Sequence, residues 1–161
     1  MSIKAAIAVP YYVMKEYLTG SWPFNRISTM AQNYDKVWII SITNPTIEGR
    51  EDNVPPLVTD GEDRIALQFH DIDSVDCDHK TIPFDLAMAD KIVNFIKKAH
   101  QGDSNDLLVV NCHAGISRSG AVSEFAGYVC DLDYSSWRRQ NSSVIPNVLV
   151  SRLLFKAWGD D

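Results

Sequence analysis

The sequence predicts an α/β fold in which a central, mostly parallel sheet is flanked by helices. Two observations favour this class: segments with strand composition alternate with segments of helical periodicity, and one strand segment is apolar throughout, as in strands covered on both faces. Strands joined by helices need crossover connections, which make neighbouring strands parallel. The 161 residues, 45% of them hydrophobic, are expected to form one domain over residues 1–161.

Four segments have the composition of strands. Residues 5–9 form a short apolar run, and residues 36–42 are rich in β-branched and aromatic side chains before residues 43–45 (Thr-Asn-Pro) stop them. Apolar residues alternate with other residues in 64–70, whereas residues 107–110 read Leu-Leu-Val-Val. This last segment is therefore expected at the centre of the sheet.

Three segments show the spacing of helices. Residues 83–100 carry apolar side chains at steps of three and four, with lysines elsewhere and Gly102 closing the segment. Residues 119–130 follow the apolar strand, and residues 148–158 place their apolar side chains on one side. The loop-rich stretches are residues 19–33, 43–63 and 71–82.

The net charge and the cysteine content limit which classes of partner the protein is expected to bind and in which compartment it is expected to act. Fifteen Lys and Arg against 21 Asp and Glu give a net charge of −6, which disfavours nucleic acid and anionic membranes as partners. No apolar run approaches the roughly 18 residues of a membrane span. Three cysteines, at 77, 112 and 130, are too few and too scattered for a disulfide framework. These features predict a reduced, cytoplasmic protein, with a monomer as the default.

The segment from Leu107 to Gly120 carries the chemistry. Cys112 stands at the carboxyl end of the apolar strand, Arg118 follows six positions later, and a helix is expected immediately after it. Ligands of open α/β sheets bind at this edge. The intervening residues can curl so that successive amides face an anion, because Gly115 can adopt a backbone angle that other residues avoid. The sequence thus predicts a phosphate-binding loop made of His113, Ala114, Gly115, Ile116, Ser117 and Arg118.

The same surroundings suit a cysteine nucleophile. Arg118 offers a planar fork to two phosphate oxygens, and the positive end of the following helix adds to its field. Cations and helix starts lower the pKa of a thiol, so Cys112 is expected to be a thiolate at neutral pH. Ser119 is placed to donate a hydrogen bond to the sulfur. A zinc site would need paired Cys and His spacings, which Cys112-His113 alone does not supply.

The run Cys112-His-Ala-Gly-Ile-Ser-Arg-Ser119 resembles the signature of the cysteine-dependent protein tyrosine phosphatases, and is most similar to that of their small dual-specificity branch. The resemblance implies a phosphocysteine intermediate, no metal and no cofactor. It also implies hydrolysis of phosphotyrosine, and whether phosphoserine and phosphothreonine are hydrolysed too stays open. One departure is Asn111, since the family has His directly before the nucleophile; Asn111 is expected to hydrogen-bond the loop backbone without carrying charge.

The expected substrate is a phosphorylated protein. The loop interior contains no Lys, whereas phosphoinositide phosphatases of this superfamily carry basic residues there. An acidic chain also disfavours RNA. The alternative function is a phosphate-binding module without turnover, which captures phosphorylated partners.

A phosphatase also needs a proton donor for the leaving oxygen, usually a carboxylic acid on a mobile loop. Asp71 is the preferred candidate, because the family pattern of alternating apolar residues ending in the acid resembles residues 67–71 best. Asp73 is the second candidate. Both belong to an acidic stretch that also holds Asp76 and Asp78. A cation site built with His70 and His79 is the alternative interpretation of this stretch, but it lacks the Gly and final Glu of an EF-hand, so a solvated loop is preferred.

Several other residues have two interpretations. Cys77 could form a reversible disulfide with Cys112 under oxidation, although a structural thiol is the simpler interpretation. Cys130 is expected in the core. Pro146-Asn147 is expected to form a turn ahead of the last helix, with no chemical role. Four aromatic residues could either line the substrate pocket or pack in the core: Tyr11, Tyr12, Trp22 and Phe24.

Overall fold

The computed structural model describes residues 1–50, 53–74 and 81–159 and has the α/β architecture that the sequence predicts. In these residues the strands are β1 (Ile3–Pro10), β2 (Lys36–Thr43), β3 (Arg64–Gln68) and β4 (Asp106–Cys112). They form one sheet in the order β1-β4-β2-β3, and every neighbouring pair is parallel. The helices are α1 (Tyr11–Thr19), α2 (Arg26–Ala31), α3 (Leu86–His100), α4 (Arg118–Val129), α5 (Tyr134–Gln140) and α6 (Val148–Trp158).

Strand β4 lies inside the sheet, as its apolar run predicts. It pairs with β1 on one side and β2 on the other, and Val110 stands beside Ala8 and Ile40 in register. All seven residues of β4 are buried. The carboxyl end of β4 therefore lies between those of its neighbours β1 and β2, along the side of the sheet where the parallel strands end.

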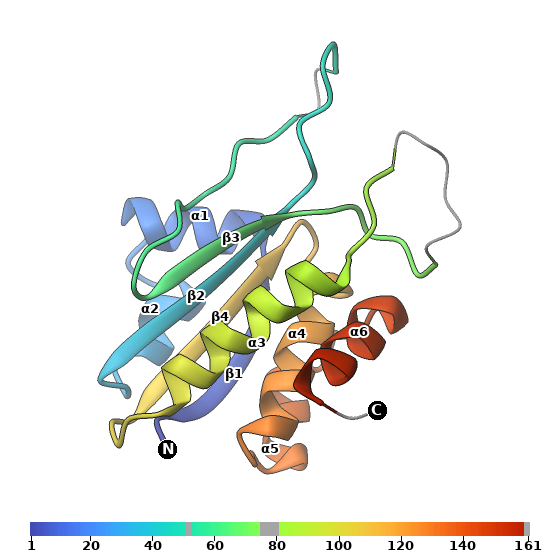
Figure 1. The fold of residues 1–161 in the computed structure, drawn as a ribbon. Helices are drawn as coiled ribbons and strands as arrows, with labels where there is room; N and C mark the ends of the chain where they lie inside the picture. The colour runs from blue at the N-terminus through green and yellow to red at the C-terminus, as the bar shows by residue number, and fades with distance from the viewer. Residues whose placement is uncertain (51–52, 75–80, 160–161) are drawn as a thin grey trace.

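Helices cover both faces of the sheet (Figure 1). On one face Val109 packs in a cluster with Met14 of α1 and Ile27 of α2. On the other face Val110 belongs to a larger core with residues of α3, α4, α5 and α6, such as Ile92. Because side chains alternate along a strand, adjacent residues of β4 supply the two cores.

Capping residues set where the predicted helices begin. Asp85 accepts a hydrogen bond from the backbone N–H of Met88 at 2.8 Å, so α3 begins at Leu86 rather than near residue 83. Helix α4 begins one residue earlier than expected, at Arg118. Helix α6 has its predicted bounds, with Asn147 as its N-cap.

Helices α1, α2 and α5 are additional to those that the sequence predicts. Helix α2 lies in a stretch expected to be a loop, and it has only 6 residues. Asn25 caps it by accepting a hydrogen bond from the amide of Ile27 at 2.9 Å. Asp133 caps the 7 residues of α5 in the same way. Helices this short depend on caps and tertiary packing, and their periodicity is too brief to recognise in a sequence.

The residue after α5 covers the free edge of β1. The side chain of Asn141 accepts a hydrogen bond from the amide of Ala8 at 2.8 Å and donates one to the carbonyl of Ala6 at 3.0 Å. A carboxamide thereby replaces a neighbouring strand at an edge whose backbone groups would otherwise be unpaired. The contact also fixes the segment after α5 beside the end of β1.

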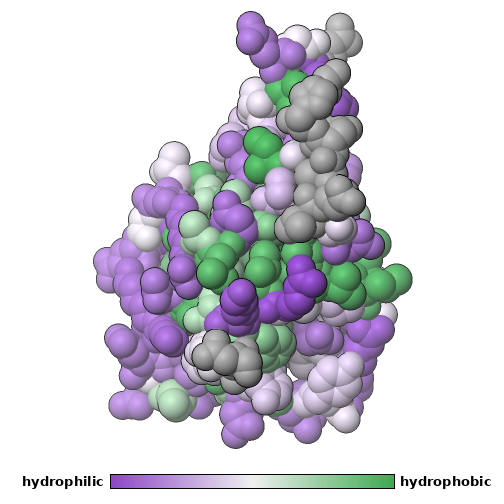
Figure 2. Space-filling model, turned by 45° about the vertical axis from the view of Figure 1, so that its right-hand side comes forward, coloured by the Kyte–Doolittle hydropathy of each residue, from purple (hydrophilic) through white to green (hydrophobic). Residues whose placement is uncertain are grey.

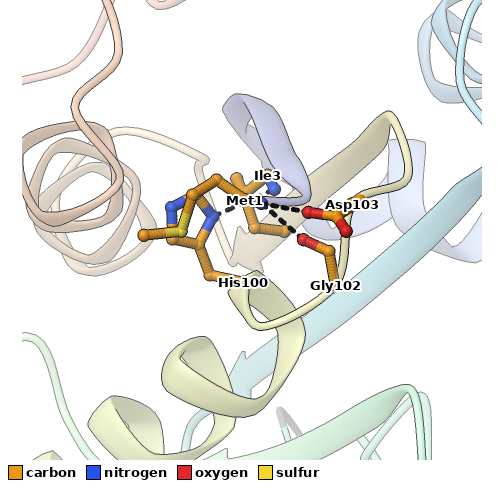
Figure 3. Close-up of polar contacts among 5 residues, drawn as sticks. All are labelled: Met1, Ile3, His100, Gly102 and Asp103. Carbon is orange, nitrogen blue, oxygen red and sulfur yellow. Dashed lines mark hydrogen bonds and ion pairs between the residues drawn. The ribbon is translucent and has the colours of Figure 1, made fainter.

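The start of β1 is tied to the carboxyl end of α3 (Figure 3). The amide of Ile3 donates to Nδ1 of His100 at 3.1 Å. The amino group of Met1 donates to the carbonyl of Gly102 and lies 3.3 Å from the carboxylate of Asp103. The acceptor role of His100 requires a neutral imidazole, because protonation converts Nδ1 into a donor.

The segment after β2 projects beyond the body of the molecule (Figures 1 and 2). On the face drawn in Figure 2, apolar residues gather across the middle and toward the right-hand edge, and hydrophilic residues dominate the left side. Across residues 1–50, 53–74 and 81–159, no helix combines the length and apolar character needed to cross a bilayer.

Candidate active site

Cys112 ends β4, and its sulfur is enclosed by the residues that follow it. The residue is 2% exposed. The Sγ atom lies 3.1 Å from Oγ of Ser119, in the first turn of α4, and accepts a hydrogen bond from the amide of Gly115 at 3.3 Å. The strand end, the loop and the helix start thus all meet at one sulfur atom.

The surroundings of this thiol favour its ionised form. Burial raises the pKa of Cys112, but hydrogen bonds from the side chain and backbone of Ser119, the charge of Arg118 and the amide of Gly115 outweigh it, and the pKa lies below its ordinary value. Cys130 has no such partners among the described residues, and burial raises its pKa to about 12. Of the two cysteines among the described residues, only Cys112 has the properties of a nucleophile.

The loop between β4 and α4 directs carbonyl groups away from itself. Three of them accept hydrogen bonds from backbone amides of other segments. The carbonyl of His113 accepts from Tyr11 at 3.1 Å, that of Ile116 from Ile145 at 3.1 Å, and that of Ser117 from Asn147 at 3.0 Å. By contrast, among the described residues the loop amides of Ala114, Ile116 and Ser117 have no acceptor. The loop therefore keeps three donors available for a ligand, and an anion is the ligand that such donors suit.

Gly115 has the conformation that its position in the motif predicts. Its φ is +73°, in the left-handed region that favours glycine. A Cβ atom added there would lie 2.4 Å from the backbone nitrogen of Pro10 and 2.5 Å from the carbonyl carbon of Val9. The loop thus packs so closely on the end of β1 that no side chain fits.

Arg118 is buried, with 4% of its surface exposed, and is held from one side only. Its Nη1 donates to Oδ1 of Asn44 at 2.8 Å and to the carbonyl of Phe69 at 2.7 Å. These two residues follow the ends of β2 and β3. Nε is buried without a partner among the described residues. A buried guanidinium donor without an acceptor is costly, and an oxyanion would satisfy it.

The structure brings Asp71 to the loop. Its Oδ1 accepts hydrogen bonds from Oγ of Ser117 at 2.9 Å and from Nδ2 of Asn147 at 2.8 Å. Asp73 makes no hydrogen bond with the described residues of the loop. Because both donors engage Oδ1, the other oxygen of Asp71 remains available for a transferable proton.

Asn147 is a site residue that the sequence reasoning missed, since its segment was expected to be a turn without a chemical role. Its Oδ1 caps α6 by accepting from the amide of Val150 at 3.0 Å. Its Nδ2 reaches across to Asp71 and to the carbonyl of Ile72 at 2.9 Å. An Asn before a predicted helix signals the cap, but the second contact depends on the tertiary fold.

Asn44 was also missed, because it was interpreted only as a residue that stops a strand. Its place at the carboxyl end of β2 is the one available signal, since ligands of α/β sheets bind at that edge.

Asn111 was expected to hydrogen-bond the loop backbone, and the structure differs from this expectation. It is fully buried, and neither polar atom of its side chain has a hydrogen-bond partner among the described residues, so the expected bond to the loop backbone is not formed.

Other expected residues lie elsewhere or cannot be placed. Three of the aromatic candidates, Tyr12, Trp22 and Phe24, are more than half exposed and so do not belong to the core. Within residues 1–50, 53–74 and 81–159, no three His, Cys, Asp or Glu residues gather as metal ligands would. Four residues of the acidic stretch, Asp76, Cys77, Asp78 and His79, lie outside the described residues.

No protein-family model matches this chain, and neither does any curated protein. The chemistry available to the site therefore follows from its own geometry. It combines a buried thiol whose pKa is lowered, amide and guanidinium donors that have no acceptor in the described part of the chain, and a carboxyl group at the rim of the loop.

Proposed function

We propose that this protein is a phosphatase that hydrolyses phosphomonoesters on phosphorylated proteins through a phosphocysteine intermediate. The observation that carries the proposal is the pairing of Cys112 and Arg118. The pKa of the Cys112 thiol is lowered, and the Arg118 guanidinium beside it keeps a buried N–H that has no acceptor among the residues the structure describes. A dianionic phosphoryl group satisfies such donors while presenting phosphorus to the sulfur.

In the first step the Cys112 thiolate attacks phosphorus, and the bond from phosphorus to the leaving oxygen breaks. Arg118 and the amides of residues 113–118 hold the three phosphoryl oxygens. Asp71 gives its proton to the leaving oxygen, so the hydroxyl of the substrate departs neutral. The products of this step are a phosphocysteine and a dephosphorylated protein.

In the second step water attacks the phosphocysteine. Asp71, now a carboxylate, accepts a proton from this water, and the bond from sulfur to phosphorus breaks. Ser119 donates a hydrogen bond to the departing sulfur, for which its Oγ is well placed at 3.1 Å. Phosphate leaves, and Cys112 is again a thiolate. The residues of the site suffice for this cycle, which uses no metal or cofactor.

The proposed substrates are proteins that carry phosphotyrosine, and phosphoserine and phosphothreonine are additional candidates. The absence of Lys within the loop and the net charge of −6 support a protein substrate over phosphoinositides and nucleic acid. We place the reaction in the cytoplasm, because reducing conditions there keep the thiol of Cys112 free. We assign it to a monomer with a single catalytic domain.

Hydrolysis of an aryl phosphate tests the proposal. Cys112→Ser is expected to abolish turnover, because a hydroxyl does not ionise at neutral pH. Asp71→Asn is expected to lower the rate by about 10²-fold or more and to remove the pH dependence that an acid gives. Asp73→Asn is the matched control and should retain the rate. Normal turnover by Asp71→Asn together with loss in Asp73→Asn would show that the acid is Asp73.

The same assay separates the enzyme from the binding module. Binding of vanadate or phosphate by the parent protein, measured by calorimetry, without any turnover of aryl phosphate or phosphopeptide would contradict the phosphatase and leave a protein that captures phosphorylated partners. Neither binding nor turnover would contradict both functions.

A further inference from the structure

A pocket lined by aromatic rings lies among α4, α5 and α6, and its volume is about 670 Å³. Helix α4 lies beside both α5 and α6 (Figure 1). Five aromatic residues line the pocket: Tyr128 on α4, Tyr134 and Trp137 on α5, and Phe155 and Trp158 on α6. We call it the aromatic pocket. Helices α4 and α6 both begin at the proposed phosphate site, and these residues lie toward their opposite ends, so the two sites are separate.

The exposed rings of the pocket rest on buried or partly buried ones. Tyr134 is 62% exposed and stacks on Trp137, which is 2% exposed, with ring centroids 5.7 Å apart. The indole N–H of Trp137 donates to Oγ of Ser123 at 2.9 Å, which fixes this ring from below. Tyr128 is 69% exposed and packs edge-on against Phe155 at 5.2 Å. The pocket therefore presents two tyrosines to solvent on a packed base.

The charges of the pocket are all negative. Glu124 and Asp131 line it, and none of its described lining residues is Lys or Arg. Neither carboxylate lies within ion-pair distance of a cationic group in the described part of the chain. The face of an aromatic ring also attracts cations. Trp158 illustrates this within the chain, since Nζ of Lys97 lies 4.9 Å from its ring centroid. Rings and carboxylates thus favour the same kind of ligand.

We propose that the aromatic pocket binds a basic segment of a partner polypeptide, with a Lys or Arg side chain seated among the rings beside Glu124 and Asp131. The charge complementarity of the pocket selects a cationic partner over a neutral one. Exposed Tyr and buried Trp are the residues that contribute most to protein interfaces, which favours a polypeptide over a small cation. The net charge of −6 adds attraction at longer range. This inference does not depend on the proposed phosphatase function.

Peptide binding tests the proposal. The probe is a short fluorescein-labelled peptide in which Lys and Arg alternate with Ser, and its neutral counterpart has Gln in place of each Lys and Arg. Fluorescence anisotropy with the full chain measures both dissociation constants. The basic peptide is expected to bind about tenfold more tightly than the neutral one, and added salt should reduce the difference.

Two substitutions assign this preference to the pocket. Tyr134→Leu keeps an apolar side chain but removes a ring. Asp131→Asn removes a charge at nearly constant shape, and Asn tolerates the φ of +57° that Asp131 adopts. Each is expected to weaken binding of the basic peptide by about two- to fivefold, and the double variant by more than either.

The matched controls change the same residue types elsewhere. Tyr12→Leu alters an exposed ring on α1, and Asp90→Asn removes an exposed carboxylate on α3. Neither residue lines the aromatic pocket. Both variants should keep the dissociation constant of the parent, which separates the pocket from the general effect of an acidic chain.

Three results would overturn the proposal. The first is equal affinity for the basic and neutral peptides. The second is an unchanged affinity for the basic peptide in the double variant of Tyr134 and Asp131. The third is tighter binding of choline than of the basic peptide, which would show that the pocket holds a small quaternary ammonium ligand instead. None of these measurements uses phosphatase activity, so failure of the aryl phosphate assay leaves the proposal standing.

Discussion

The hydroxyl of Ser119 lies 3.1 Å from the sulfur of Cys112, and its hydrogen bond is the largest of the contributions that lower the pKa of this thiol. Burial acts in the opposite direction. Ser119→Ala is therefore expected to raise the pKa of Cys112. The midpoint of the alkylation rate with iodoacetamide, measured against pH, should move to higher pH.

This alkylation experiment needs a background in which one thiol reacts. Cys77→Ser removes the cysteine that lies outside the described residues, and Cys130, whose pKa is raised to about 12, stays protonated. Ser135→Ala on α5 is the control and should keep the midpoint of the parent. An unchanged midpoint in Ser119→Ala would mean that Ser119 does not stabilise the thiolate.

Asn147 links the cap of α6 to the proposed acid, and two substitutions separate these roles. Asn147→Ser keeps a capping side chain but is too short to reach Asp71, so the stability that the cap contributes should be kept while catalysis falls by about tenfold, a part of what an acid contributes. Asn147→Ala should also lose about 0.5–2 kcal/mol of unfolding free energy. Urea denaturation and the pH dependence of phosphopeptide hydrolysis measure the two effects.

The dependence on leaving group identifies a positioning role for Asn147. A phosphate ester with an acidic leaving group needs little protonation, so Asn147→Ser should lower its hydrolysis less than that of phosphotyrosine. Equal losses with both substrates would indicate a general disturbance of the loop. Full activity with both would remove Asn147 from the site.

The parts of the fold that the sequence predicts are those with long or uniform patterns. Strand β4 is recognisable because all four residues of 107–110 are apolar, and α6 because its apolar side persists over 11 residues. Helices α2 and α5 are too short for a periodic pattern, and their caps at Asn25 and Asp133 resemble ordinary loop residues. Such elements form because tertiary packing stabilises them.

The candidate site divides in the same way. Cys112, Gly115 and Arg118 are close in the chain, so their spacing, together with the apolar strand before them and the helix after them, predicts the loop. Asn44 reaches Arg118 because β2 is the neighbour of β4 in the sheet. Asn147 reaches Asp71 because the start of α6 lies against the segment after β3. No local pattern carries that information.

Gly115→Ala should destabilise the protein more than a comparable glycine substitution. Gly20 has a similar φ, +67°, but a Cβ there would meet no atom within 4 Å. Gly20→Ala is therefore expected to cost about 1–2 kcal/mol, from backbone strain alone. Gly115→Ala adds a clash with Pro10 at 2.4 Å, so its cost in urea denaturation should exceed about 3 kcal/mol. Equal costs would contradict the close packing of the loop on β1.

The contact between His100 and Ile3 predicts a loss of stability at mildly acidic pH. Burial, the positive amino terminus and Lys4 lower the pKa of His100 below 6.5, and its neutral Nδ1 accepts from Ile3 at 3.1 Å. The unfolded chain therefore binds a proton that the folded state resists. Stability from this group is complete above pH 6.5 and declines as the pH falls through the folded pKa. Urea denaturation from pH 7.5 to 5 should show this decline, and His100→Gln should flatten it; equal slopes in both proteins would contradict the prediction.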